Sequence, residues 1–102
     1  MSPSIERTFL VEHYRPGTTT ADFVAIADRV RATTEEMTRG GASIRVLHST
    51  LVPEDETYFF ILAAPDAAVV RETYARAGIG FERIVSALEL ERPVREEPHA
   101  PV

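Results

Sequence analysis

Apolar and polar side chains alternate over residues 4–13, which is the pattern of a β-strand with one covered face. The more apolar side of this strand, which we expect to face the core, carries Ile5, Phe9 and Val11. The opposite side is more polar and consists of Glu6, Thr8, Leu10 and Glu12.

The spacing changes to that of an amphipathic helix after the loop "RPGTTT". Side chains of the apolar stripe recur every three or four positions, at Phe23, Ile26, Ala27, Val30, Thr34 and Met37. Thr19 stands three residues before Asp22, an arrangement that predicts a helix N-cap. Gly40 and Gly41 predict the end of the helix, because glycine adopts the left-handed conformation that stops one.

Residues 43–52 and 57–64 flank the turn-like segment "PEDE" and predict an antiparallel hairpin. The second of these strands is apolar on both sides, so we expect both of its faces to be covered. A second helix is predicted to begin near Asp66 and to end at "AGIG", and a last strand spans residues 82–91.

The order β-α-β-β-α-β predicts an α+β, ferredoxin-like fold, with a four-stranded antiparallel sheet and two helices on one face. The first and third strands then form the centre of the sheet. We expect residues 1–91 to form a single domain and the proline-rich, charged residues 92–102 to form a disordered tail. Because the other sheet face stays open, we expect a homodimer of the dimeric α/β barrel type, with a partly enclosed space between two sheets.

Charge and composition narrow the functional classes. The formal net charge is −5 and no basic run exceeds two residues, which argues against a nucleic-acid partner. The longest apolar run, "YFFILAAP", is far shorter than the roughly 20 residues of a membrane span, so we expect a cytoplasmic protein without a membrane partner. The chain has no cysteine, so a metal would be bound by imidazole and oxygen ligands, a set that suits nickel, zinc, manganese or iron.

The run "LHSTLVPEDETYFFILAAPDAAVVRETYARAGIGFERIVSALEL", together with "IERTF" and "ADRVRATTEEM", resembles a family of small ferredoxin-like proteins. That family was once catalogued as a domain of unknown function, and its members are now often labelled nickel-binding. The resemblance covers about residues 5–91 and implies binding of nickel or another divalent metal, with no organic cofactor. The family often has cysteines flanking the aromatic residue of the third strand, where this chain has Tyr58 and Phe60, and a proline where it has Gly80.

His48, in the middle of an apolar strand, is the principal candidate for chemistry. It is either a packed residue with a satisfied hydrogen bond or a ligand that faces the intersheet space. Across the hairpin its partner is Phe60 in one register and Ile61 in a register shifted by one residue. If the face of His48 is the open one, Thr50 and Tyr58 would line the same space.

The predicted metal ligands are His48, Glu6, Glu12 and His13. Thr8, Thr50 and Phe60 are predicted to line the cavity around them. For His13, at the end of the first strand, a surface position without a ligand is the alternative. Two further hypotheses stay open: a cofactor-free enzyme of isomerase, cyclase or hydrolase type, with His48 as acid/base and Tyr58 as donor on a small apolar substrate, and a purely structural dimer.

Overall fold

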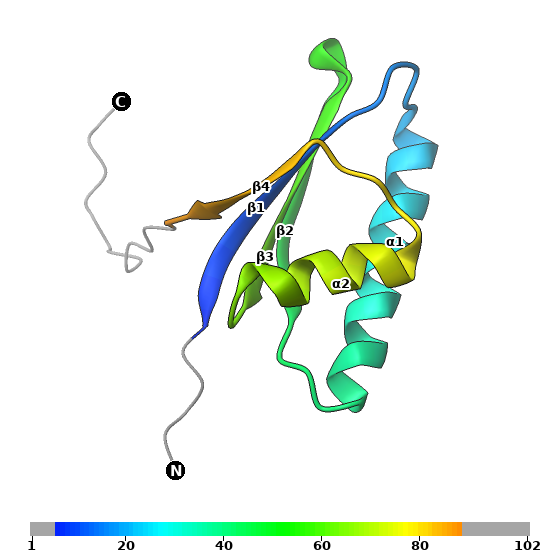
Figure 1. The fold of residues 1–102 in the computed structure, drawn as a ribbon. Coiled ribbons are helices and arrows are strands. Elements are labelled where there is room, and N and C mark those ends of the chain that lie inside the picture. Colours follow the sequence, from blue (N-terminus) through cyan, green and yellow to red (C-terminus); the bar gives the residue numbers. More distant parts are fainter. Residues whose placement is uncertain (1–5, 89–102) are drawn as a thin grey trace, which may run out of the picture.

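The structure of the protein, a computed structural model, describes residues 6–88 (Figure 1). Its elements follow the order β1 (Arg7–Tyr14), α1 (Thr20–Arg39), β2 (Arg45–Val52), β3 (Thr57–Ala64), α2 (Ala67–Ala77) and β4 (Arg83–Ala87). A short 3-10 turn, Pro53–Asp55, connects β2 to β3. The predicted tail, residues 92–102, and the end of the predicted last strand, 89–91, lie outside the described residues.

The four strands form one antiparallel sheet in the order β2-β3-β1-β4, so the first and third strands are central, as predicted. Both helices lie on the same side of this sheet, to its right in Figure 1. These features confirm the ferredoxin-like α+β fold. Within residues 6–88, no helix combines the length and the apolar character needed to cross a membrane.

Local signals in the sequence set the helix ends. The Thr19 side chain accepts a hydrogen bond from the Asp22 amide at 3.0 Å, and the Asp22 carboxylate accepts one from the Thr19 amide at 3.1 Å, which completes a capping box. At the other end, the left-handed residue is Gly41, with φ of 104°, rather than Gly40. Asp66 caps α2 by accepting from the Val69 amide.

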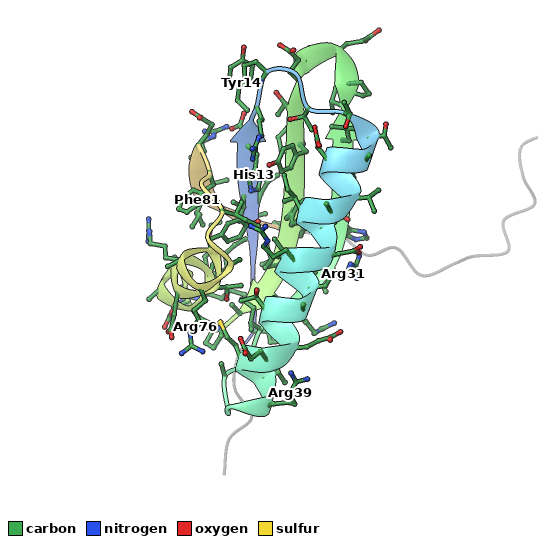
Figure 2. The ribbon with its side chains drawn as sticks, turned by 90° about the vertical axis from the view of Figure 1, so that its right-hand side faces the viewer. His13, Tyr14, Arg31, Arg39, Arg76 and Phe81 are labelled. Atoms are coloured by element: carbon green, nitrogen blue, oxygen red, sulfur yellow. The ribbon has the colours of Figure 1, made fainter. Side chains whose placement is uncertain are left out.

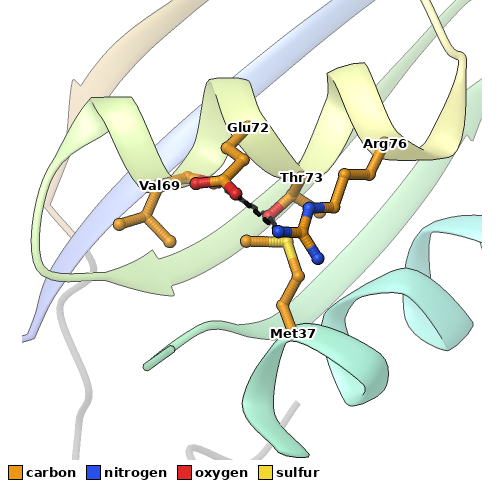
Figure 3. A network of polar contacts seen from close by, with 5 residues as sticks. All are labelled: Met37, Val69, Glu72, Thr73 and Arg76. Atoms are coloured by element: carbon orange, nitrogen blue, oxygen red, sulfur yellow. Dashed lines mark hydrogen bonds and ion pairs between the residues drawn. The ribbon is translucent and has the colours of Figure 1, made fainter. Parts of the chain in front are cut away.

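The two helices contact each other through a buried polar pair (Figure 3). The Thr73 hydroxyl of α2 lies 3.1 Å from the Met37 sulfur of α1 and also lies 2.9 Å from the Val69 carbonyl oxygen. Nearby, Arg76 and Glu72 form an exposed ion pair at 2.9 Å. The contact between Thr73 and Met37 places α2 against the C-terminal half of α1.

The core lies between the sheet and the helices. The sheet contributes to it Phe9, Val11 and His13 from β1, and Tyr58, Phe60, Leu62 and Ala64 from β3. The helices contribute Val30, Met37, Val70 and Tyr74, among others. The alternate residues of β1 and β3, such as Leu10, Phe59 and Ile61, stay half-buried on the other face of the sheet.

The register of the hairpin decides which side chains share a face with His48. Val52 pairs with Thr57, and the register continues unbroken from this pair to His48, which lies opposite Ile61. A bulge then follows between His48 and Val46. Of the two registers considered from the sequence, the shifted one is therefore correct. The bulge inserts one extra residue in β2, which resets the alternation of its side chains relative to β3.

Candidate functional site

The open face of the sheet carries His48. The His48 side chain is exposed, and its cross-strand partner Ile61 belongs to the half-buried side of β3. Thr50 is exposed on the same side of β2, opposite Phe59. The interpretation of His48 as a packed core residue is therefore wrong for a single chain.

Two residues expected beside His48 lie on the other side of the sheet. Tyr58 and Phe60 are buried beneath the helices, with exposures of 1% and 0%. The prediction that they line the open face is wrong, because the pairing of β2 with β3 is shifted by one residue and adjacent positions of a strand face opposite layers. The enzyme hypothesis that joined His48 to Tyr58 loses its pair of residues for the same reason.

The two candidate carboxylates are each held by an arginine. Glu12 of β1 accepts from Arg83 of β4 at 2.6 Å, and Glu6 accepts from Arg45 at 3.0 Å. The Glu6 carboxylate raises the pKa of Arg45 above its usual value through the hydrogen bond and its charge. Both carboxylates are partly exposed, so each pair contributes only modest stability, and exchange of the arginine for another cation costs little.

One chain does not assemble a complete coordination set. Among residues 6–88, no cluster of three or more histidine, aspartate or glutamate side chains is arranged to hold a metal ion. His48 is the only described histidine on the open face, because His13 projects from the other side of the sheet. Within residues 6–88 the open face therefore offers one imidazole, and a metal ion bound there needs further ligands.

His13 is the largest departure from expectation at the site. It is 2% exposed and lies under the helices, so the prediction of a surface position is wrong (Figure 2). The sequence contained the signal for this, since His13 has the same parity along β1 as the core residues Phe9 and Val11. The strand continues to Tyr14, so His13 is still inside the alternating segment rather than beyond its end.

Aromatic rings surround His13. Its ring stacks on that of Tyr58, with centroids 4.3 Å apart and 12° between the planes. Phe60 and Tyr74 each have ring centroids 5.3 Å from that of His13. Nδ1 of His13 lies 3.3 Å from the Tyr58 carbonyl oxygen. Since a carbonyl only accepts, this contact assigns the ring proton to Nδ1 and leaves a lone pair on Nε2.

Burial keeps the polar groups of this cluster neutral. Desolvation lowers the pKa of His13 to about 4, although the backbone hydrogen bonds to Tyr58 and Val11 and the charge of Glu12 act in the opposite direction. Desolvation likewise raises the pKa of Tyr74 and of Tyr58, the latter against the opposing effect of Arg15. At neutral pH the cluster therefore contains an uncharged imidazole and two uncharged phenols.

Tyr74 packs inward from α2 together with Val70 and Thr73. Its neighbour in space, His13, is 61 positions earlier in the chain, and no local pattern connects the two residues. Their contact depends on how α2 packs against the sheet.

The fold and the open, partly apolar sheet face define a small ferredoxin-like α+β protein. A family model described as "Nickel responsive protein SCO4226-like" matches residues 9–86, and the chain belongs to this family. The crystal structure of SCO4226 from Streptomyces coelicolor A3(2) is similar in fold, with a TM-score of 0.69 and 16% sequence identity. The match covers 82% of this chain and 99% of that chain. A comparison with curated proteins found no match.

Proposed function

We propose that the protein binds a divalent transition metal ion such as nickel on the open face of its sheet, with His48 as the ligand from each chain. Its family is described as nickel responsive, which names the metal but not the mode of action. The observation that carries the proposal is the position of His48, an exposed imidazole on a half-buried apolar face. Imidazole is a good ligand for nickel and for zinc.

A second copy of the chain supplies the rest of the site in this proposal. Leu10, Phe59, Ile61 and Val85 leave the open face partly exposed and largely apolar in one chain, a surface suited to a subunit interface. A two-fold axis that passes through that face close to His48 doubles every ligand and brings two His48 imidazoles together. Glu12, on the same face of β1, is the nearest candidate oxygen ligand in the sequence-predicted set, and Arg83 releases it when the metal charge replaces the guanidinium.

The test is a calorimetric titration of the full chain with Ni²⁺, Zn²⁺ and Co²⁺, together with light scattering to measure the molar mass. We expect binding of Ni²⁺ tighter than about 100 μM and a dimeric mass. His48→Ala should weaken Ni²⁺ binding at least roughly tenfold, which corresponds to loss of one ligand. His99→Ala serves as the matched control, because it also removes one imidazole from the chain, at a position outside residues 6–88.

Equal Ni²⁺ affinity in the wild type and His48→Ala would overturn the assignment of the ligand. A monomeric mass at all Ni²⁺ concentrations would overturn the shared site, even if a single chain binds the ion.

A further inference from the structure

Two buried polar atoms of the helix-side core stand out because neither has a hydrogen-bond partner in the structure. They are Nε2 of His13 and the hydroxyl of Tyr74, the two such side-chain atoms among residues 6–88. The two side chains are 2% and 1% exposed, and their ring centroids are 5.3 Å apart with 35° between the planes. A buried polar atom without a partner is costly, so a group that satisfies both atoms is favoured.

The hydrogen-bonding roles of these two atoms are complementary. Nδ1 of His13 donates to the Tyr58 carbonyl, so Nε2 can only accept. The Tyr74 phenol is free to donate its proton. A ligand group that satisfies both must donate to the imidazole and accept from the phenol. A hydroxyl does this, whereas a carbonyl cannot donate, an ammonium cannot accept and a methyl group can do neither.

A cavity of about 310 Å³ adjoins the pair. Its lining consists of His13, Tyr14, Arg15, Tyr58, Gly80, Phe81 and Glu82. In Figure 2, which looks onto the helix side of the sheet, His13 projects from β1 and Phe81 lies in the connection from α2 to β4. The Phe81 ring packs edge-on against Tyr74, with centroids 5.4 Å apart, so Tyr74 lies directly behind the wall that His13 and Phe81 form.

The chemistry of the lining restricts the ligand further. Tyr14 and Phe81 are the aromatic residues of the lining whose rings are accessible, and such rings pack well against a planar ring ligand. Arg15 and Glu82 contribute one charge of each sign, so the lining favours no net charge. A neutral ligand also suits the neutral imidazole.

We propose that this cavity binds a small phenolic compound, whose ring packs among the aromatic side chains and whose hydroxyl inserts between His13 Nε2 and the Tyr74 hydroxyl. The site lies on the opposite side of the sheet from His48 and is independent of metal binding. Since both polar atoms are covered, the ligand reaches them by displacing the Phe81 side chain. Phe81 is half-buried and lies in the connection between α2 and β4, outside both elements.

The experiment compares phenol with toluene, which has the same shape but carries a methyl group in place of the hydroxyl. The full chain is titrated with each compound, and binding is followed by two-dimensional ¹H–¹⁵N NMR. We expect phenol to shift the amides of residues 13–15 and 80–82 and to bind roughly tenfold more tightly than toluene, because two hydrogen bonds are gained. Tyr74→Phe should abolish most of the preference for phenol over toluene and leave the toluene affinity unchanged. The dispersion of its ¹H–¹⁵N spectrum shows whether the variant is folded.

Equal affinities for phenol and toluene would overturn the proposal, as would shifts confined to other residues or no binding of either compound at millimolar concentration. The comparison of the two compounds on the wild-type chain needs no variant, so it stands even if Tyr74→Phe does not fold. His13→Phe is the second variant, and retention of the phenol preference in it would also contradict the assignment.

Discussion

The ring of His13 is stacked on the ring of Tyr58 with a centroid distance of 4.3 Å, beneath the two helices. Because this contact holds His13 on the helix side, the two histidines of residues 6–88 lie on opposite sides of the sheet. His48 lies on the open face, where a metal or a second chain can reach it, and His13 lies in the core. A role for one of them therefore does not require the other.

The stability of the protein should depend on pH through His13. Its pKa is lowered from 6.5 to about 4 in the folded state, so below pH 6.5 the unfolded chain binds a proton that the folded chain does not. Above pH 6.5 this effect does not reduce the free energy of unfolding. The free energy of unfolding then falls as the pH drops toward 4. The loss amounts to roughly 3 kcal/mol, measured by urea unfolding at a series of pH values.

The variant His13→Phe provides the control for this effect, because it keeps an aromatic ring against Tyr58 but cannot titrate. Its free energy of unfolding should vary less than that of the wild type between pH 6.5 and 4. Identical pH profiles for the two proteins would show that His13 is not buried in its neutral form.

Removal of the Tyr74 hydroxyl should not destabilise the ligand-free protein. The hydroxyl is buried without a partner among the described residues, so Tyr74→Phe removes a desolvation cost and no hydrogen bond. We expect the free energy of unfolding to stay the same or to rise by about 1 kcal/mol. A loss of more than about 1 kcal/mol would mean that the hydroxyl has a partner.

Adjacent phenylalanines of β3 should respond differently to truncation, since they lie on opposite faces. Phe60 is fully buried in the helix-side core, so Phe60→Ala should cost about 3–5 kcal/mol of stability. Phe59→Ala should cost clearly less in the isolated chain and should instead weaken self-association, measured by sedimentation equilibrium. The reverse order of the two stability losses would contradict the observed register.

The capping box of α1 should contribute measurably to stability. Thr19→Ala removes the side-chain acceptor for the Asp22 amide and should cost about 1 kcal/mol by urea unfolding. Val24→Ala, at a half-exposed position of the same helix, is the control and should change stability by less. Equal effects would mean that the cap does not hold the helix start.

The fold was largely predictable from the sequence because periodicity and end signals agree at each element. Thr19 and Asp66 mark the helix starts, and the alternation of β3 marks a covered strand. The position of His13 was also predictable, since it continues the alternation of Phe9 and Val11. The prediction of a surface position fails because β1 continues past His13 to Tyr14.

Other features of the two candidate sites depend on packing between distant segments. The register of the β2–β3 hairpin, with Val52 opposite Thr57, places His48 opposite Ile61, and the sequence alone is compatible with two registers. The unpartnered hydroxyl of Tyr74 lies beside the ring of His13, a contact that the sequence of α2 does not specify. Sequence patterns identify which residues face inward, whereas their hydrogen bonds depend on the three-dimensional arrangement.

The most direct measurement of the central claim is a crystal structure of the protein grown with Ni²⁺, with data collected at the nickel absorption edge. We predict an anomalous peak that lies between the facing sheets of two chains, within coordination distance of His48 from each of them. Facing sheets without a peak near His48 would contradict this prediction. A peak bound elsewhere by a single chain would also contradict it.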